Sequence, residues 1–228
     1  MFEEFLNRER GIFDILNKLL KENLTFVVIG GYGVSAYKHR FSIDADIVIS
    51  HEDVQKFEEV LKKSGFKKTA SKELENLYSS KFIRYATEGK ANVTIDLLVG
   101  GMGVRQTNAA FSFELLKENS DYRKIIGSSG EAKALIPKKE VLIAMKLHAG
   151  RLTDFRDVAA LARDVDIGQI KSLLQIGDKK RIREHLKKLE SLLGTADFMN
   201  SFKGVFIEKK YDIDLQSLKR ICKLTEFL

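Results

Sequence analysis

Apolar residues recur every three or four positions near both ends of the chain, which is the spacing that one face of an amphipathic helix produces. The first such segment spans residues 2–20. After Pro137 the pattern returns in four segments, over residues 138–149, 154–163, 167–174 and 179–193. We therefore predict an N-terminal helix and, beyond Pro137, a region that is mostly helical to residue 228.

Between these helical ends the apolar residues form short runs or alternate with polar ones, as in β-strands. Strands are predicted over residues 25–29, 43–49, 80–87 and 92–99, and helices over 32–39 and 51–64. The pattern is weakest over 104–137, where we expect short strands or loops. The elements predict an α+β fold, with a small mixed sheet flanked by helices in residues 1–136 and a helical region packed against it in residues 137–228.

The charge balance bears on the class of partner. The chain has 39 Lys and Arg against 32 Asp and Glu, a net charge of +7, and a pI near 9.3. A basic surplus suits polyanions such as tRNA, DNA or nucleoside triphosphates, although many basic proteins bind none of these.

Several features point to a cytoplasmic protein with no membrane partner. Cys222 is the single cysteine, so no internal disulfide can form, and its apolar neighbours place it in the core. No apolar run approaches the roughly 18 residues of a membrane span. The amphipathic start MFEEFLNRER is not a signal peptide. His39 and His148 have no partner at metal-ligand spacing and are expected to be structural or on the surface.

The strand predicted over residues 43–49 carries two acidic residues on one face. Asp44 and Asp46 are two positions apart, so their carboxylates project from the same side of the strand. The alternate positions, which should face the core, are Ile43, Ala45, Ile47 and Ile49. Two neighbouring carboxylates repel unless a cation lies between them, and oxygen ligands near a phosphate favour Mg²⁺.

The preceding strand ends at Gly30-Gly31. Glycine lets the backbone bend sharply and approach a phosphate closely. The helix expected next would present its N-terminal N–H groups to that phosphate. A glycine pair, a phosphate and two carboxylates would therefore lie together.

A third acidic residue, Asp96, interrupts the apolar strand from Val93 to Val99 and points away from the predicted core face. If this strand lies beside the Asp44–Asp46 strand, three carboxylates converge. Two metal ions about 4 Å apart can then assist an in-line phosphoryl transfer. Asp96 would be placed to help deprotonate the attacking hydroxyl.

Each of these signals has a simpler explanation when taken alone. A Gly-Gly pair is usually only a turn, Asp-x-Asp is usually the solvated face of an edge strand, and Asp96 could be an edge residue. Their combination, in this order and spacing, favours a metal-dependent site.

The segment from Gly30 to Asp46 resembles the signature of the DNA polymerase beta-like nucleotidyltransferase superfamily: Gly-[Gly/Ser], nine to thirteen residues, then Asp-x-[Asp/Glu], with a later third Asp. Twelve residues separate Gly31 from Asp44. The run Arg40-x-Ser42-x-Asp44-x-Asp46 is similar to the Arg-x-[Ser/Thr]-x-Asp-x-Asp form of the minimal enzymes, including toxins of the AbiE type.

A second segment, from Ala144 to Val158, resembles the Lys-Leu-x-Ala-x-Arg-x-Lys-Asp-x-x-Asp motif of the AbiE-like group, with Thr153 in place of the usual Lys. The resemblance covers residues 25–160 and is specific only at these two segments. It implies that Lys146 contacts a triphosphate and that Asp157 holds or orients that lysine or the triphosphate. A Lys–Asp salt bridge that only fixes the helical region is the alternative.

The remaining site residues have open roles. Arg40 and Arg151 could bind phosphate or could be structural ion-pair partners. Ser42 is expected to shape the start of its strand by hydrogen bonding. Gly150 should end a helix, and Asp154 should cap the next one with Asp157 in its first turn.

The resemblance implies an Mg²⁺-dependent enzyme with two metal ions, Mn²⁺ being possible, that moves a nucleoside monophosphate from an NTP to an acceptor hydroxyl. The acceptor could be tRNA, a protein or a small molecule. By resemblance only, the enzyme could be the toxin of a toxin–antitoxin pair, with an antitoxin as partner. The alternative function is a non-catalytic protein that keeps the fold to bind nucleotide or RNA.

Overall fold

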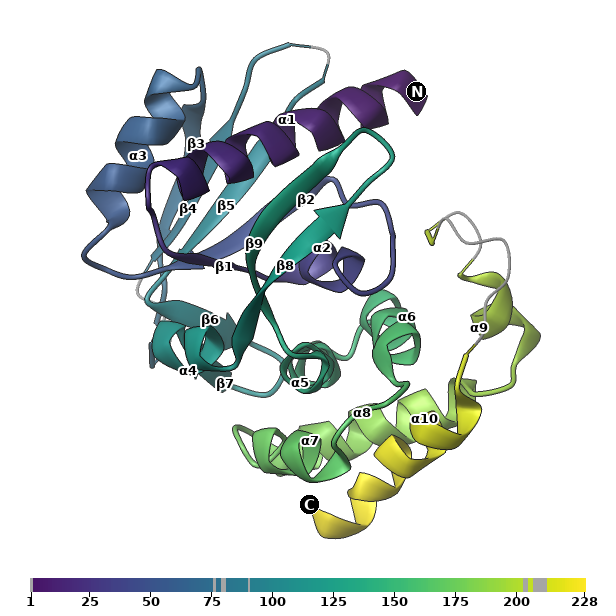
Figure 1. The fold of residues 1–228 in the computed structure, drawn as a ribbon. Coiled ribbons are helices and arrows are strands. Elements are labelled where there is room, and N and C mark those ends of the chain that lie inside the picture. Colours follow the sequence, from purple (N-terminus) through teal and green to yellow (C-terminus); the bar gives the residue numbers. More distant parts are fainter. Residues whose placement is uncertain (1, 76, 79–80, 90, 203–204, 207–212) are drawn as a thin grey trace. The chain divides into compact units, whose positions relative to one another are not determined.

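The computed structural model describes residues 2–75, 77–78, 81–89, 91–202, 205–206 and 213–228 (Figure 1). The chain divides into two compact units. The first consists of Met1–Met102 and Phe111–Pro137, and the second of Gly103–Ala110 and Lys138–Leu228. The first contains a mixed sheet and the second is mainly helical, which confirms the α+β class. Within the described residues, no helix has both the length and the apolar character that a membrane span needs.

Seven strands form the mixed sheet in the order β3-β4-β5-β2-β1-β9-β8. They are β1 (Phe26–Val28), β2 (Asp44–Ile49), β3 (Lys67–Glu73), β4 (Lys81–Ala86), β5 (Thr94–Val99), β8 (Ser120–Ile126) and β9 (Glu131–Pro137). β2 runs parallel to β5, and β1 parallel to β9, whereas the other pairs are antiparallel. The predicted strands at 25–29, 43–49 and 92–99 are confirmed as β1, β2 and β5, and they are neighbours in the sheet. The predicted strand at 80–87 corresponds to β4, except that Ser80 lies outside the described residues.

Helices α1 (Phe2–Lys21) and α3 (Val54–Lys63) pack on the sheet face that turns away from the aspartates. Gly11 of α1 lies against the Val93 side chain, which shares its face with Ile95. Phe57 of α3 packs edge-on against Phe26 of β1, with ring centroids 6.1 Å apart. The hydrophobic core beneath these helices holds the central strands in place. The short helices α2 (Gly30–Ser35) and α4 (Phe113–Glu118) complete this unit.

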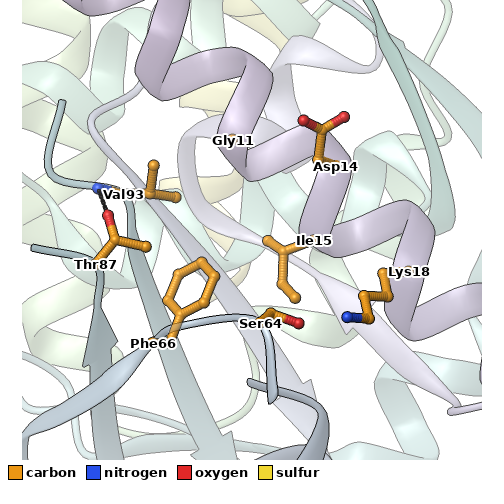
Figure 2. A pocket seen from close by; sticks show the side chains of 8 residues that line it. All are labelled: Gly11, Asp14, Ile15, Lys18, Ser64, Phe66, Thr87 and Val93. Carbon is orange, nitrogen blue, oxygen red and sulfur yellow. Dashed lines mark hydrogen bonds between the residues drawn. The ribbon is translucent and has the colours of Figure 1, made fainter. Parts of the chain in front are cut away.

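A cavity of about 340 Å³ lies between α1, the end of α3 and the segment before β5 (Figure 2). Phe66 and Val93 contribute apolar surface to it, and Asp14 and Lys18 of α1 contribute charge. Because Val93 belongs to the face opposite Asp96, this cavity is separate from the predicted aspartate site.

The second unit is built from helices α5 (Lys139–Ala149), α6 (Leu152–Leu161), α7 (Ile167–Leu173), α8 (Lys179–Leu192), α9 (Ala196–Asn200), α10 (Leu215–Cys222) and the 3-10 helix η1 (Lys223–Phe227). The tip of the hairpin β6 (Gly101–Val104) and β7 (Ala109–Ser112) belongs to it as well. Gly150 ends α5, as expected, with a left-handed φ of 65°. A Cβ there would lie 2.4 Å from the His185 ring, so this helix end needs glycine.

Three expectations were wrong in detail. Ile43 is 59% exposed rather than buried, because β2 begins one residue later. The helix expected over residues 32–39 begins at Gly30 and ends at Ser35. The segment 104–137 contains a helix, α4, and an antiparallel hairpin of two seven-residue strands, β8 and β9.

His148 is structural, as expected, and is completely buried within the helical unit. Its Nε2 lies 3.3 Å from the carbonyl oxygen of Leu173, so Nε2 carries the proton and donates. Nδ1 then accepts from the Thr107 hydroxyl at 2.9 Å. Burial lowers the pKa of His148 from 6.5 to about 4. The neutral ring thus connects α5, α7 and the hairpin tip.

This buried imidazole should make the helical unit sensitive to acid. As the pH falls below 6.5, the unfolded chain binds a proton that the folded chain resists down to about pH 4. The free energy of unfolding should therefore fall by about 3 kcal/mol across this range from this residue alone. Urea unfolding at several pH values should give a flatter dependence for His148→Gln than for the native chain. His51→Gln, which alters an exposed histidine, should keep the native dependence. Parallel curves for His148→Gln and the native chain would contradict this account.

Candidate active site

The three predicted aspartates lie on one face of two adjacent strands. β2 pairs with β5 in parallel, and Asp46 is the direct partner of Asp96. Cross-strand partners share a face, and Asp44 shares the face of Asp46 because the two are two residues apart. The prediction that the strand of Asp96 neighbours that of Asp44 and Asp46 is therefore confirmed. Asp44 and Asp46 are half-buried, whereas Asp96 is 3% exposed.

The two glycines make room for this row of carboxylates. Gly30 has a φ of 63°, and a Cβ on it would lie 2.1 Å from Oδ2 of Asp46. A Cβ on Gly31 would lie 2.2 Å from the Ser42 hydroxyl. The first glycine is thus required by both backbone conformation and space, and the second by space. The backbone of β1 and α2 passes directly beside the carboxylate of Asp46.

Arg84 of β4 belongs to this site, although it was not predicted. β4 pairs with β5 so that Arg84 is the direct partner of Asp96. Its guanidinium donates two hydrogen bonds to the Asp96 carboxylate, from Nε at 2.7 Å and from Nη2 at 2.6 Å. The same Nη2 lies 3.7 Å from Oδ2 of Asp44. The carboxylates of Asp44 and Asp96 therefore both lie within 3.7 Å of the same nitrogen, Nη2 of Arg84.

The neighbouring carboxylates change the pKa of Arg84. Its hydrogen bonds with Asp96 raise the pKa of Arg84 above its usual value, with smaller contributions from the charges of Asp44 and Asp46. The carboxylates thus attract a cation to this point of the sheet. Among the residues that the structure describes, we find no three His, Cys, Asp or Glu side chains close enough together to hold a metal ion. The donor chemistry, three carboxylates on one face, nevertheless fits Mg²⁺ or Mn²⁺.

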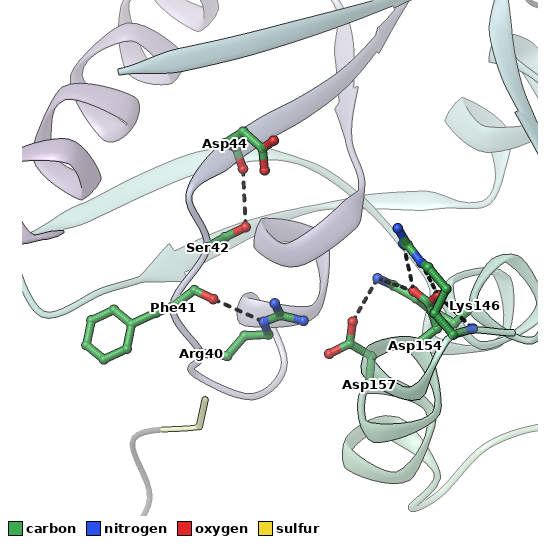
Figure 3. A network of polar contacts seen from close by, with 8 residues as sticks. Arg40, Phe41, Ser42, Asp44, Lys146, Asp154 and Asp157 are labelled. Carbon is green, nitrogen blue, oxygen red and sulfur yellow. Dashed lines mark hydrogen bonds and ion pairs between the residues drawn. The ribbon is translucent and has the colours of Figure 1, made fainter. Parts of the chain in front are cut away.

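Ser42 and Arg40 organise the approach to β2 (Figure 3). The Ser42 hydroxyl donates to the carbonyl of Asp44 at 3.2 Å, and Tyr32 donates to the carbonyl of Ser42 at 3.3 Å. The prediction that Ser42 shapes the strand entry is confirmed. Arg40 donates from Nε to the Phe41 carbonyl at 3.2 Å, and its backbone exchanges hydrogen bonds with the Ser35 hydroxyl.

In the helical unit, Lys146 forms a buried network with two aspartates (Figure 3). Its Nζ lies 2.7 Å from Asp157 and 3.3 Å from Asp154. Both aspartate side chains are 1% exposed, and Lys146 is 13% exposed. A salt bridge thus exists, whether or not the lysine also binds phosphate. Asp157 lies in the second turn of α6, one turn beyond its predicted position.

Asp154 closes the start of α6 from the third residue of the helix, not from the predicted cap position, which Arg151 occupies. It accepts from the backbone N–H of Arg151 at 3.2 Å and from Arg151 Nε at 2.6 Å. Burial alone would raise the pKa of Asp154, but the hydrogen bond from Arg151 and the charge of Lys146 hold it below its usual value. The Arg151 side chain is 67% exposed, although its Nε and Nη2 both donate to the Asp154 carboxylate.

Comparison with models of known protein families and with curated proteins gives no match. Solved structures do match. JHP933 from Helicobacter pylori aligns over 99% of this chain and 91% of its own, with 16% identity and a TM-score of 0.50. A candidate nucleotidyltransferase from H. pylori aligns over 99% of this chain and 94% of its own, with 17% identity and a TM-score of 0.50.

The chain has a nucleotidyltransferase fold. At this level of identity the likeness concerns the fold and not the reaction. The antibiotic-resistance factor ANT(2'')-Ia aligns less well, over 80% of this chain and 94% of its own, with 14% identity and a TM-score of 0.49.

Replacing Arg84 tests whether the carboxylates of Asp96 and Asp44 need a counter-charge, and whether Mg²⁺ can supply it. Arg84→Met should lower the free energy of unfolding by about 2 kcal/mol in EDTA, because the buried Asp96 loses its counter-charge. Millimolar Mg²⁺ should restore part of this loss by taking the place of the guanidinium. Arg123→Met, which removes an arginine 3.8 Å from exposed Asp121, should cost less than about 1 kcal/mol. Urea unfolding measures both, and an equal loss in Arg84→Met with and without Mg²⁺ would argue against a metal site.

Proposed function

We propose that this chain is a nucleotidyltransferase that moves a nucleoside monophosphate from an NTP to an acceptor hydroxyl. One observation carries the proposal: Asp46 and Asp96 are direct partners on adjacent parallel strands, on the face of Asp44 and beside Gly30. Asp is depleted in strands, so three on one face at this position need a reason beyond folding. Binding a metal–triphosphate complex supplies that reason.

In the proposed reaction the acceptor oxygen attacks the α-phosphorus of the NTP. The bond between this phosphorus and the bridging oxygen breaks, and pyrophosphate leaves. Two Mg²⁺ ions, or Mn²⁺ in their place, would neutralise the phosphates and lower the pKa of the attacking hydroxyl. Asp44 and Asp46 would hold the metal–triphosphate complex, and Asp96 would accept the hydroxyl proton. Gly30 and Gly31 are proposed to let the backbone approach a phosphate closely, and Arg40 and Ser42 to line the path of that phosphate.

For Asp96 to accept that proton, at least one of the two hydrogen bonds from Arg84 to the Asp96 carboxylate must break. Arg84 is 42% exposed on its side chain, so it can swing toward solvent or toward a phosphate without losing core packing. Its planar guanidinium suits a phosphate as well as a carboxylate. In this proposal Arg84 neutralises the carboxylates before substrate binds.

The helical unit is proposed to contribute Lys146, Arg151 and Asp157 to nucleotide binding, as the family resemblance implies. Asp157 and Asp154 fix the Lys146 ammonium at 2.7 and 3.3 Å, and a fixed ammonium is a suitable point charge for a phosphate. The exposed guanidinium of Arg151 could meet a phosphate oxygen in the same manner.

The finer assignments rest on resemblance to the AbiE-like group. They are an acceptor that is a tRNA end or a protein hydroxyl, a toxin role with an antitoxin partner, and action in the cytoplasm. Small molecules are the remaining acceptor class.

The alternative is a protein that binds nucleotide or RNA without catalysis. One observation favours it: the Arg84 guanidinium already lies between Asp96 and Asp44, where a metal would be needed. In that case a triphosphate would bind without a divalent metal ion.

Labelled substrates test the proposal. The chain is incubated with each of four α-labelled NTPs, Mg²⁺ or Mn²⁺, and either total tRNA or a protein extract. Label should appear in one acceptor class, and should be absent with an Asp44→Asn, Asp46→Asn variant. A small-molecule extract is tested in the same way. If no label is transferred under any of these conditions, the proposed enzyme activity is wrong and the non-catalytic binding protein is favoured.

A further inference from the structure

The net positive charge of the chain comes from one unit. The residues of the helical unit, Gly103–Ala110 and Lys138–Leu228, include 20 Lys and Arg and 13 Asp and Glu. The residues of the sheet unit include 19 of each, which together account for the totals of 39 and 32. The sheet unit is therefore neutral, and the whole surplus of +7 belongs to the helical unit. A charge separated in this way indicates a polyanion-binding surface more strongly than the total alone.

Helix α8 carries the densest part of this charge. Its 14 residues include six cations, Lys179, Lys180, Arg181, Arg183, Lys187 and Lys188, and two acids, Glu184 and Glu190. Lys180, Arg183 and Lys187 are exposed and follow the spacing of one helix face. The buried residues Ile182, Leu186 and Leu189 anchor the opposite side. The cationic stripe, defined as Lys180, Arg183 and Lys187, therefore has a fixed orientation.

Glu184 lies on the same face of α8, but it pairs with Arg181 at 3.0 Å rather than with the stripe. Within the described part of the chain, Lys180 and Lys187 form no ion pair, whereas Arg183 donates to a main-chain oxygen of Leu228. On the sheet unit, by contrast, Lys62 pairs with Glu58 at 3.3 Å and Lys67 with Glu88 at 2.7 Å. The charges of Lys180 and Lys187 are thus available to an external anion, and Arg183 lies between them on the same face.

A groove beside the stripe brings one further basic residue and two acidic ones next to it. A cavity of about 340 Å³ between α8 and the α10–η1 segment is lined by Arg183, Lys187, Lys223 and the Thr225 side chain. Glu190 and Glu226 also line it, so three cations face two acids there. Lys223, like Lys187, has no ion-pair partner among the described residues. The groove thus places one further cation, Lys223, beside the stripe without adding net positive charge.

We propose that the cationic stripe and this groove are a docking surface for RNA. The eight residues from Lys180 to Lys187 rise about 10 Å along the helix axis, which corresponds to about three phosphates of one strand. One side of α8 is buried, so a strand lying along its exposed side fits better than insertion of the helix into a duplex groove. The choice of RNA rests on the proposed function, which needs an acceptor hydroxyl; the surface itself does not depend on catalysis.

Binding of a fluorescein-labelled single-stranded RNA, measured by anisotropy between 50 and 200 mM salt, tests this proposal. With about four phosphates contacted, log Kobs should fall with log salt with a slope near −3. The variant Lys180→Gln, Arg183→Gln, Lys187→Gln should bind at least about tenfold more weakly and lose about two units of slope. A control with the same charge change, Lys62→Gln, Lys63→Gln, Lys67→Gln, should bind like the native chain. Circular dichroism checks that both variants fold.

An equal effect of the two triple variants would overturn the proposal, since it would show dependence on net charge alone. So would unchanged binding by the stripe variant, tighter binding to DNA of the same sequence, or equal binding to anionic vesicles or polyglutamate. The Asp44→Asn, Asp46→Asn variant should bind this RNA as the native chain does. RNA binding without transfer would therefore count only against the proposed enzyme, and transfer without stripe-dependent binding only against the surface.

Discussion

Replacing Asp46 by Asn should reduce nucleotidyl transfer at least about 1,000-fold, which corresponds to about 4 kcal/mol of transition-state stabilisation. Asp46 is central because it is the direct partner of Asp96, shares a face with Asp44 and lies against Gly30. An amide keeps the shape of the side chain but loses the charge that a metal ion requires. The loss should therefore appear in kcat with little change in stability.

Initial rates with the identified NTP and acceptor measure this effect. Asp121→Asn removes an exposed carboxylate from β8, 56% exposed, and should leave the rate unchanged. If Asp46→Asn kept more than a tenth of the native rate, the aspartates would not be the metal ligands of the reaction.

Gly30→Ala should disable the site and destabilise the sheet unit together. A left-handed φ of 63° costs an alanine about 1 kcal/mol, and the new methyl would lie 2.1 Å from Oδ2 of Asp46. Moving that carboxylate or the backbone adds about 1–3 kcal/mol. We expect a total loss of about 2–4 kcal/mol in the free energy of unfolding, and transfer reduced at least about 100-fold because Asp46 is displaced.

Gly65→Ala is the matched control. Its φ is 84°, so the same strain applies, but a Cβ there meets no atom within 4 Å. Its expected loss is about 1 kcal/mol, with full activity. Urea unfolding and initial rates separate the two effects. Similar losses of stability and activity in both variants would mean that the contact between Gly30 and Asp46 is unimportant.

Local patterns were sufficient for the elements that carry the aspartates. The alternation around Asp44 and Asp46 predicted β2, and the single Asp96 in an apolar run predicted a strand with an outward carboxylate. Helical spacing predicted α1, α3 and α5 to α8; α1, α3 and α8 bury one stripe of side chains, whereas α5 is buried nearly all round. Ile43 was misplaced because alternation does not reveal where strand pairing stops.

Arg84 was missed because its role depends on register. In the observed register, Arg84 is opposite Asp96 and Ala86 is opposite Thr94. A difference of one or two residues in the β4–β5 connection would place another side chain beside Asp96. The sequence contains no separate signal for this length, so only the paired strands identify the arginine.

The segment 104–137 was the least predictable for a different reason. β8 has a largely exposed, charged sequence, with Ile125 as its buried residue. The strand is specified by hydrogen bonding to β9 rather than by its own apolar pattern. The metal, nucleotide and acceptor roles of the site residues remain predictions, since they depend on molecules that bind to the chain.

Calorimetry with a non-hydrolysable NTP, with and without Mg²⁺, tests the central claim most directly because it needs no acceptor. The native chain should bind the triphosphate at least about tenfold more tightly with Mg²⁺, and the Asp44→Ala, Asp46→Ala variant should lose this difference. Equal affinity of the native chain with and without Mg²⁺, or a metal effect that persists in the variant, would contradict the account.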